Sequence, residues 1–346
     1  VVAGKDHLID RYLRAVEAEI GMEPPAGPID AVFVGGGTPS RVPPPRLGRL
    51  LQMLRSRFGL ASDAEVSLGA NPEDVTPSLA ERLQAAGFNR ISLGVQSFDP
   101  GVLEALGRRH TPEQGEAAVW MARQAGFPSI NVDLILGTPG ETPQSWVDTV
   151  ERALDTGVDH LSAYALTVER GTPLARAVAA GAPAPDPDDQ ADKHEFVSEA
   201  AARSGLVPYE VSNFARPGHG CRYNLLTWAQ GEYLAFGAGA HGHRGGVRRR
   251  NHRRLEAYLS TVERDDRPES GREALDDWGG EQERLLLGLR RIAGVRTGWG
   301  GERLLASSAG SRLLAAGVLE LWGQRLRIRR LLLADEVSRA VLALEP

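Results

Sequence analysis

Apolar and polar positions follow two periods that take turns along the first half of the chain. Apolar residues at helical spacing predict an amphipathic helix over residues 7–20, which ends at Gly21. Short apolar runs then alternate with helical patterns. The predicted strands are 31–34, 65–70, 90–95, 130–136 and 160–166, and the predicted helices between them are 43–58, 77–86, 112–125 and 143–155. Five strand–helix units in series indicate an α/β protein whose parallel sheet curls into a barrel or part of one.

Small or polar residues follow each predicted strand. The first strand runs directly into Gly35-Gly36-Gly37-Thr38. Consecutive glycines expose backbone N–H groups and suit a carboxylate, a ribose or a phosphate, although a glycine triplet also fits an ordinary tight turn. The later strands end in Asn71-Pro72, Gln96-Ser97-Phe98, residues 137–142 and Tyr164-Ala165. Because the carboxyl ends of barrel strands form one mouth, this recurrence favours a ligand site.

Two polar residues stand out within or directly after apolar strands. Gln96 follows Leu93-Gly94-Val95, and Asp133 lies inside the run 130–135. A buried amide or carboxylate is costly unless it has partners. The two residues therefore indicate either contacts to a ligand or a buried hydrogen-bond network that fixes the barrel.

The next part of the chain is less regular. Residues 179–187 are rich in Ala, Pro and Gly and predict a flexible connection across the barrel mouth. A helix over 188–204 and a further strand over 209–214 are expected next. Residues 215–251 are expected to be a long irregular passage, and loops of that length in compact domains usually serve function.

Two features of this passage allow more than one interpretation. His241 lies among small residues, where it could be a metal ligand, an acid–base group or a hydrogen-bonded structural residue. The run Arg248-Arg249-Arg250 could bind acidic groups such as propionates or phosphates, or it could be a solvated face.

The C-terminal part has the pattern of a smaller helical unit. A helix over 252–262 and a charged linker over 263–273 precede it. The predicted elements are helices over 281–292, 303–316 and 335–344 and a hairpin of 318–322 with 325–328 around Gly323-Gln324. This order is similar to a winged helix. A clear basic helix is lacking, which favours a lid or docking module over a DNA-binding one.

Composition narrows the classes of function. The net charge of −5 and the pI near 6.0 give no electrostatic basis for nucleic acid as a partner. Cys221 is the only cysteine in the sequence, so no internal disulfide can form and a reducing, cytoplasmic location is expected. No apolar run approaches the roughly 18 residues of a membrane-spanning helix.

Several motifs in this order resemble the radical S-adenosylmethionine (SAM) family of oxygen-independent coproporphyrinogen III oxidase-like proteins, and within it the HemW-type heme chaperones. The matching stretches span nearly the whole chain. They are residues 35–40, 70–72, 91–98, 106–110, 132–135, 137–142, 162–166, 209–215 and 239–242. Each stretch alone is a weak signal, and the ordered set is highly specific.

The resemblance implies a partial (β/α) barrel whose mouth holds SAM on a 4Fe-4S cluster. It implies that Gly36, Gly37 and Thr38 meet the methionine amino group. A glycine backbone at this place would let the ligand lie close to the chain.

The resemblance also implies contacts at the other strand ends. Gln96 and Arg108 would meet the methionine carboxylate and neighbouring polar atoms, and Asp133 and Ala165 the ribose and adenine side. The chemistry agrees, because a guanidinium can fork onto a carboxylate and a carboxylate can accept hydrogen bonds from ribose hydroxyls.

The sequence departs from the family pattern in its cofactor ligands. The CxxxCxxC motif that binds the cluster is absent from the printed chain, whose first helix is the one expected to follow that motif. Gly69 stands where the family usually has a Glu before Ala-Asn-Pro.

The heme motif also differs. The chaperones' His-Asn-x-x-Tyr-Trp reads here as residues 223–228, in which Tyr223 replaces the histidine and Asn224 and Trp228 match. Tyr223 could ligate ferric heme as a phenolate, and Cys221 and His241 are further candidate ligands.

We therefore expect a radical SAM-like partial barrel over 1–262, with the first strand and cluster loop missing, and a winged-helix-like helical module over 275–346. The expected function is that of a heme chaperone, with heme and heme-receiving proteins as partners. A coproporphyrinogen III oxidase-type radical oxidoreductase and a cluster-less binding scaffold are the alternatives. Enzymatic activity would require an upstream cysteine motif.

Overall fold

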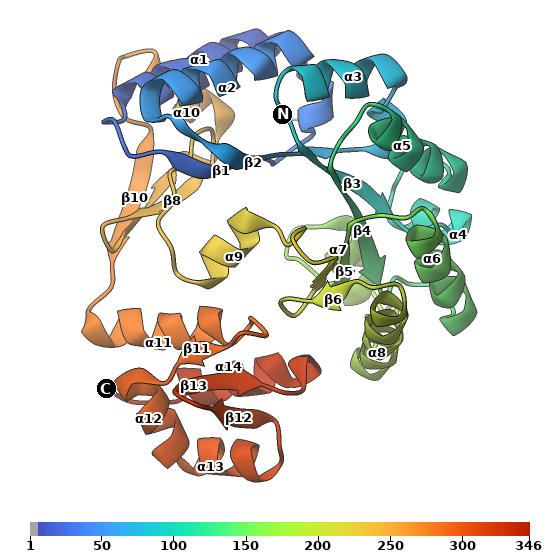
Figure 1. The fold of residues 1–346 in the computed structure, drawn as a ribbon, viewed down its shortest axis with the longest axis vertical. Helices are drawn as coiled ribbons and strands as arrows, with labels where there is room; N and C mark the ends of the chain where they lie inside the picture. The colour runs from blue at the N-terminus through green and yellow to red at the C-terminus, as the bar shows by residue number, and fades with distance from the viewer. Residues whose placement is uncertain (1–5) are drawn as a thin grey trace. The chain divides into compact units, whose positions relative to one another are not determined.

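The computed structural model describes residues 6–346 (Figure 1). Contacts between residues divide the chain into two compact units, which we describe separately. Unit 1 comprises the described residues up to Val32, Pro45–Glu65 and Cys221–Pro346. Unit 2 comprises Phe33–Pro44 and Val66–Gly220.

The main sheet has seven strands in the order β1-β2-β3-β4-β5-β7-β6. Strands β2 to β5 pair in parallel, as predicted, whereas β7 runs antiparallel to β5 and to β6. The strands are β1 (Ile29–Val34), β2 (Leu60–Ala70), β3 (Arg90–Gln96), β4 (Ser129–Leu136), β5 (His160–Ala165), β6 (Val207–Pro208) and β7 (Asn213–Ala215). The curled sheet confirms the expected α/β partial barrel.

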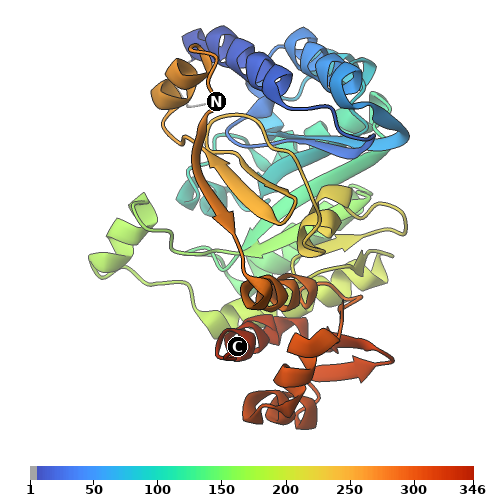
Figure 2. The ribbon, with the colours of Figure 1, turned by 90° about the vertical axis from the view of Figure 1, so that its left-hand side faces the viewer.

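Helices cover the outer side of this sheet in unit 2 (Figure 1). They are α3 (Pro77–Ala85), α4 (Pro100–Ala105), α5 (Pro112–Gln124), α6 (Pro143–Asp155) and α8 (Pro187–Arg203), with short 3-10 turns η2 (Pro39–Arg41) and η3 (Pro72–Asp74). A further helix, α7 (Pro173–Ala179), has no buried residue and projects from the rest of unit 2 in Figure 2. The sequence patterns did not predict α4 and α7.

The helices of unit 2 begin where their local sequence dictates. At α3, α5 and α6 a threonine hydroxyl accepts a hydrogen bond from a backbone N–H of the first turn, and a proline occupies the first helical position. Proline suits this position because it has no N–H to satisfy and its φ is already helical. The predicted helix over 143–155 matches α6 at both ends.

The strand predicted over 209–214 is confirmed only at Asn213 and Phe214, which belong to β7. Residues 209–212 form a turn between β6 and β7. The buried Glu210 carboxylate accepts hydrogen bonds from the backbone N–H of Ser212 and from the side chain of Asn213. These bonds close the turn, so only three residues from Asn213 onward pair with β5.

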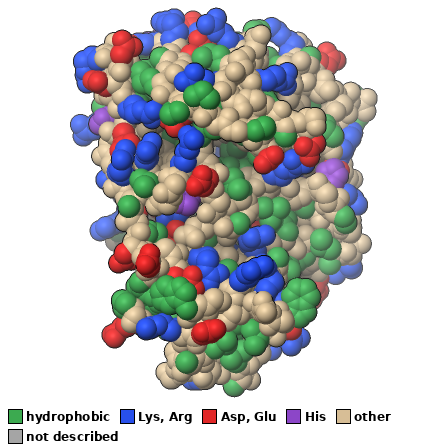
Figure 3. All heavy atoms as spheres, turned by 60° about the vertical axis from the view of Figure 1, so that its left-hand side comes forward, with side chains coloured by type: hydrophobic (Ala, Val, Ile, Leu, Met, Phe, Trp, Pro, Cys, Tyr) green, Lys and Arg blue, Asp and Glu red, His purple; other side chains and the backbone are tan. Residues whose placement is uncertain are grey.

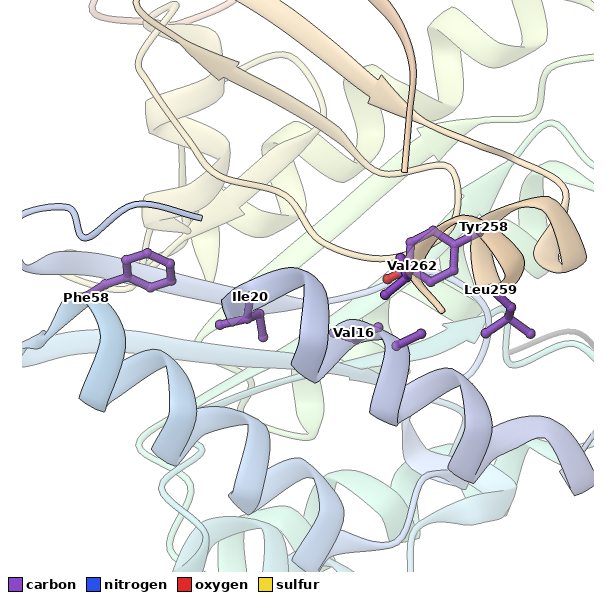
Figure 4. Close-up of a cluster of buried hydrophobic side chains, with 7 residues drawn as sticks. Val16, Ile20, Phe58, Tyr258, Leu259 and Val262 are labelled. Carbon is purple, nitrogen blue, oxygen red and sulfur yellow. The ribbon is translucent and has the colours of Figure 1, made fainter. Parts of the chain in front are cut away.

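Unit 1 has its own core between helices that are distant in the sequence. Its helices include η1 (Asp6–Leu8), α1 (Ile9–Met22), α2 (Pro44–Phe58) and α10 (Leu255–Val262). Val16, Ile20, Phe58 and Tyr258 belong to one buried apolar cluster (Figure 4). Burial of such side chains contributes about 1.5–3 kcal/mol each.

A buried carboxylate extends this core. Glu19 on α1 accepts hydrogen bonds from Tyr258 Oη (2.6 Å), Asn251 Nδ2 (2.6 Å) and Gly237 N (2.8 Å). Burial raises the pKa of Glu19 above its ordinary value. The three donors join α1 to α10 and to the segment between residues 237 and 251.

Two irregular regions of the prediction contain regular structure. Residues 215–251 include α9 (Arg222–Trp228), β8 (His241–Arg244) and β9 (Val247–Asn251), and the expected linker 263–273 overlaps β10 (Glu269–Ala274). These strands form an antiparallel sheet in the order β10-β9-β8. Gly245 and Gly246 both have positive φ between β8 and β9, as a tight hairpin turn requires.

The C-terminal helices and hairpin agree with the predicted pattern. The elements are α11 (Asp277–Gly288), β11 (Val295–Arg296), α12 (Gly298–Ala306), α13 (Ser308–Ala315), β12 (Leu319–Trp322), β13 (Arg325–Ile328), η4 (Leu331–Leu333) and α14 (Ala334–Leu342). The predicted helix over 303–316 is split by Ser307, whose hydroxyl caps α13. In the part of the chain that the structure describes, no helix has the length and apolar character needed to cross a membrane.

Candidate functional site

The loops that follow β1 and β2 are joined to each other in unit 2. Ser40 Oγ donates to Asp74 Oδ2 at 2.7 Å and accepts from the backbone N–H of Asn71 at 3.4 Å. Ahead of Ser40, Gly36 and Gly37 have positive φ angles of 79° and 64°. The three glycines of the loop are exposed. The hydrogen bond from Asn71 to Ser40 places the loop beside the end of β2, and the positive φ angles are of the kind that favours glycine.

Gln96 ends β3 in a strained conformation. Its φ is 68°, which is uncommon for a residue with a side chain, and the register with β4 shifts between Leu93 and Gln96. The side chain is buried, and its Nε2 lies 2.8 Å from the position that a Cβ on Gly94 would take. Such outliers persist where the surroundings hold them and cluster at functional sites. The ligand contact of Gln96 stays a prediction beside the alternative of a buried hydrogen-bond network.

Asp133 is half-buried on β4 and is held at both carboxylate oxygens. Ser92 Oγ donates to Oδ2 at 2.8 Å, and Asn131 Nδ2 donates to Oδ1 at 2.7 Å. A carboxylate has about four acceptor positions, so each oxygen can still accept a further hydrogen bond. Asp133 therefore belongs to a hydrogen-bond network, and its contact with a ligand stays a prediction that its remaining acceptor capacity allows.

Arg108 has two acidic groups, Glu73 and Asp133, as electrostatic neighbours. It is half-buried, whereas Arg109 is exposed. Burial lowers the pKa of the Arg108 guanidinium, while the charges of Glu73 and Asp133 act in the opposite direction. The arginine remains charged, because even a lowered arginine pKa lies far above neutral pH.

Glu73 is a residue that the sequence patterns did not single out. Its Oε2 lies 3.5 Å from Nδ1 of the buried His110, whose Nε2 lies 2.9 Å from the carbonyl oxygen of Val95. Burial lowers the pKa of His110. Its position directly after Asn71-Pro72, at a strand end, is the signal that could have identified Glu73.

The end of β5 contributes Tyr164 and Ala165. Ala165 is exposed and pairs with Leu136 of β4. Tyr164 as a whole residue is 41% exposed, yet its surroundings raise its pKa to about 12, first by burial and then by the charge of Asp133. Asp133 therefore has Arg108 and Tyr164 as electrostatic neighbours, and Tyr164 belongs to the strand end Tyr164-Ala165 that the sequence analysis expected at the barrel mouth.

The loop after β4 is held by a buried ion pair. Lys193 Nζ on α8 lies 2.9 Å from Glu141 Oε2, with side-chain exposures of 3% and 1%. Glu141 Oε2 also accepts from the backbone N–H of Gly137 at 2.7 Å. Burial by itself lowers the pKa of Lys193, but the hydrogen bonds to the carboxylates of Asp189 and Glu141 together raise it above its ordinary value. In the same loop the buried hydroxyl of Thr138 has no hydrogen-bond partner among the described residues.

The heme-ligand candidates lie in unit 1, on and around α9. Glu65 Oε1 accepts from the backbone N–H of Arg222 at 3.0 Å and lies 3.5 Å from Cys221 Sγ, at the start of the helix. Tyr223 and Asn224 follow in the first turn and Trp228 ends the helix, where Arg290 lies over the Trp228 ring at 5.1 Å. The three motif residues therefore share one short helix.

An aromatic series leads from Tyr223 to a histidine that the sequence patterns did not single out. The Tyr223 and Tyr233 rings meet edge-on at 6.0 Å, and the Tyr233 and His243 rings lie 6.3 Å apart. Burial and Tyr233 raise the pKa of Tyr223. His241 is exposed at the start of β8.

The basic run on β9 takes part in ion pairs. Arg248 pairs with Glu283, and Arg249 Nε lies 3.7 Å from Glu269. Acidic and basic side chains are also interspersed on the face of the molecule in Figure 3. These pairs favour the interpretation of the run as a charged surface. Over residues 6–346, no three His, Cys, Asp or Glu side chains gather where they could hold a metal ion.

Comparisons with known proteins agree with these motifs. The model of the radical SAM superfamily matches residues 5–153. The chain is 43% identical over 343 residues to the heme chaperone HemW of Mycobacterium tuberculosis, a match that covers 96% of this chain and 86% of that protein. It is 34% identical over 292 residues to the heme chaperone HemW of Bacillus subtilis, covering 83% and 77%.

A solved structure shares the fold. Coproporphyrinogen III oxidase (HemN) from Escherichia coli, a radical SAM enzyme, superposes with a TM-score of 0.82 and 24% sequence identity. The match covers 99% of this chain and 85% of that one. At this identity the similarity concerns the fold.

Proposed function

This chain belongs to the HemW family of heme chaperones within the radical SAM superfamily, and we propose that it binds heme and transfers it to heme-receiving proteins. The observation that carries the proposal is the near full-length similarity to curated heme chaperones, at 43% identity over 96% of the chain. The family's cofactors are SAM and a 4Fe-4S cluster.

We place the SAM site at the strand ends of unit 2. Gly36, Gly37 and Thr38 would meet the methionine amino group, because the exposed backbone of the two glycines, with its positive φ, lets a ligand approach closely. Gln96 and Arg108 would meet the carboxylate. The strained backbone of Gln96 and the half-buried guanidinium support these roles.

Asp133 and Ala165 would contact the ribose and adenine. The remaining acceptor capacity of Asp133 supports this assignment, since ribose hydroxyls are donors. The backbone of Ala165 lies at the exposed end of β5, next to β4. The residues present thus fit SAM.

The printed residues do not provide the ligands of the 4Fe-4S cluster. A 4Fe-4S cluster is held by cysteine thiolates, and the printed residues contain one cysteine, Cys221. This stretch of chain does not fit the cluster. Where both groups are bound, SAM and the cluster supply radical chemistry.

We place heme at α9, with Tyr223 as the candidate axial ligand and Asn224 and Trp228 beside it. Tyrosine ligates heme iron in other proteins as a phenolate, and the half-buried position of Tyr223 next to Tyr233 provides aromatic surroundings. His241 and Cys221 are the alternative ligands. His243 is a further candidate heme ligand in this segment, because it lies in the same aromatic series as Tyr223 and Tyr233.

The chaperone proposal is tested by binding and release of heme. The purified protein should bind hemin saturably at about one equivalent, and it should transfer the hemin to an apo-acceptor protein such as apomyoglobin, followed by the shift of the Soret band. Saturable binding without transfer would indicate a heme-binding scaffold, and an absence of saturable binding would overturn the proposal.

The SAM site is tested by a pair of adjacent arginines. Arg108→Ala should weaken SAM binding in calorimetry by about tenfold or more, since a hydrogen bond to a charged group contributes about 1.5–3 kcal/mol. Arg109→Ala is the matched control, because Arg109 is exposed and should leave the affinity unchanged. Equal affinities of the two variants would count against the placement of Arg108.

Two further features belong to the proposal. We assign the barrel to residues 1–262 and a helical module to 275–346, and the antiparallel β11-β13-β12 sheet with α11 to α14 supports the second assignment. The single cysteine of the printed residues supports a reducing, cytoplasmic location for heme transfer.

A further inference from the structure

A continuous set of hydrogen bonds runs across three strands of unit 2 and ends at Asp133. It begins at Tyr209, in the turn before β7, whose hydroxyl lies 2.9 Å from Nε2 of His160. Nδ1 of His160 lies 2.6 Å from Oδ1 of Asn131. Asn131 Nδ2 then donates to Asp133 Oδ1 at 2.7 Å and to Ser92 Oγ at 2.6 Å.

The direction of each hydrogen bond follows from Asp133. An ionised carboxylate can only accept, so the Asn131 atom that faces it must be the NH₂ group. Oδ1 of Asn131 consequently faces His160 and accepts. Ser162 Oγ also donates to this oxygen, at 3.2 Å, which is consistent with the same orientation of the amide.

The orientation of Asn131 determines the tautomer of His160. Because Oδ1 of Asn131 is an acceptor, Nδ1 of His160 must carry the proton. His160 is 1% exposed, and burial together with the positive charge of Arg90 keeps its pKa well below the ordinary value, so the ring is neutral. Nε2 is then the acceptor, and the Tyr209 hydroxyl donates to it.

Every hydrogen bond in the set therefore points toward Asp133. The serine closes the set, because Ser92 Oγ accepts from Asn131 and donates to Asp133 Oδ2 at 2.8 Å. Each carboxylate oxygen receives one donor from the protein, and the carboxylate is fixed in position while half-buried. A carboxylate held in this way pays little entropy when it accepts further hydrogen bonds.

We propose that Tyr209 and His160 are positioning residues that orient Asn131 and, through it, the Asp133 carboxylate toward the ribose hydroxyls of a bound nucleoside. The inference rests on the proposed SAM site. It adds that the preference for a ribose with free hydroxyls is set by residues up to four hydrogen bonds away from the ligand. None of these residues touches the ligand in this arrangement except Asp133.

The test compares nucleosides with and without the ribose hydroxyls. Adenosine and 2′,3′-dideoxyadenosine compete with SAM in calorimetric titrations, and the ratio of their affinities measures the contribution of the hydroxyls. The wild type should prefer adenosine. Tyr209→Phe, which removes only one hydroxyl group, should reduce this preference by about tenfold, the equivalent of one hydrogen bond.

Matched variants separate positioning from stability. His160→Asn retains an N–H near the place of Nδ1 and should keep more of the preference than His160→Leu. The control is His194→Gln, since His194 is half-buried in unit 2 and bonds to the carbonyl oxygen of Val211 at 2.8 Å, outside the set. It should lower the melting temperature more than the preference for adenosine.

A readout without ligand completes the test. The imidazole ¹⁵N spectrum of the wild type should show His160 as the Nδ1-protonated tautomer, and an Nε2-protonated ring would overturn the inference. An unchanged preference in Tyr209→Phe would overturn it while leaving the SAM site in place. A wild type that binds neither SAM nor adenosine would instead refute the proposed site, and the positioning role with it.

Discussion

Replacing Tyr223 by histidine should strengthen heme binding and change its dependence on pH and on the oxidation state of iron. Tyr223 is half-buried in the first turn of α9, edge-on to Tyr233. Only its phenolate is a good ligand for iron. Burial and Tyr233 raise the pKa of Tyr223 above its ordinary value of 10, so the phenolate is disfavoured at neutral pH.

The cost of this ionisation can be bounded from below. With a pKa of 10, ionisation at pH 7 costs three pKa units, or about 4 kcal/mol, because each unit corresponds to 1.36 kcal/mol. The raised pKa makes the cost larger. A neutral imidazole carries almost no such cost above a pH of about 6.5. If the side chain is the ligand, Tyr223→His is therefore expected to bind hemin more tightly at neutral pH, with an upper limit on the order of a thousandfold that is reached when phenolate and imidazole bind the iron equally well.

The pH dependence has a definite sign. Below the pKa of Tyr223, the phenolate fraction rises about tenfold for each pH unit, so hemin affinity of the wild type should rise with pH across about 6.5 to 9.5. The affinity of Tyr223→His should be nearly constant over the same range. A phenolate also favours ferric iron, so the wild type should lose heme on reduction whereas the histidine variant keeps it.

The assay is a hemin titration followed by the Soret band, before and after addition of dithionite, for the wild type, Tyr223→Phe and Tyr223→His. Tyr233→Phe serves as the control, because it keeps the aromatic neighbour and removes its hydroxyl. If Tyr223→Phe binds hemin with an unchanged spectrum and affinity, Tyr223 is not the ligand. The candidates would then be Cys221, His241 and His243.

Three further outcomes follow from the structure. Gly69→Glu should tighten SAM binding about tenfold or more in calorimetry, because a Cβ at Gly69 meets no atom within 4 Å and the carboxylate would add a charged hydrogen bond. An affinity of Gly69→Glu no higher than that of Gly69→Ala would contradict this prediction. Lys193→Met should lower the free energy of unfolding in urea by about 3–5 kcal/mol, since it leaves the Glu141 carboxylate buried without its cation. Asp189→Asn should lower the free energy of unfolding far less, because Asp189 is 36% exposed. The 346-residue chain treated with iron and sulfide should form no stable 4Fe-4S cluster, as it has one thiol, and about four irons bound per chain would disprove this.

Local chemistry explains why most of the barrel could be predicted. The boundaries of α3, α5 and α6 are encoded in a threonine followed by a proline, so these starts are visible without any tertiary contact. The apolar strands between them are long enough to be recognised from residue type alone. Their parallel order then follows from the alternation of strands and helices.

The misread regions have identifiable causes. The run 209–214 has the composition of a strand, but the Glu210 carboxylate captures the N–H of Ser212 and bends the chain. The hairpin of β8 and β9 carried a usable signal, since Gly245-Gly246 between two short runs is typical of a tight hairpin turn. The start of α9 carried none, because Cys221 makes no side-chain cap there.

The candidate site likewise has residues that the sequence reveals and contacts that it does not. Gln96 and Asp133 could be identified in the sequence, because a polar residue within an apolar strand is conspicuous whatever its partners are. The hydrogen bonds that hold Asp133 in position could not be identified in the sequence. They reach Tyr209 through side chains on different strands, and each of those residue types is common at its position. The direction of each hydrogen bond depends on the whole set. The carboxylate determines the orientation of the amide, and the amide determines the tautomer of the imidazole. The chemistry of the proposed ribose contact therefore depends on tertiary structure, even though its central residue is evident from the sequence.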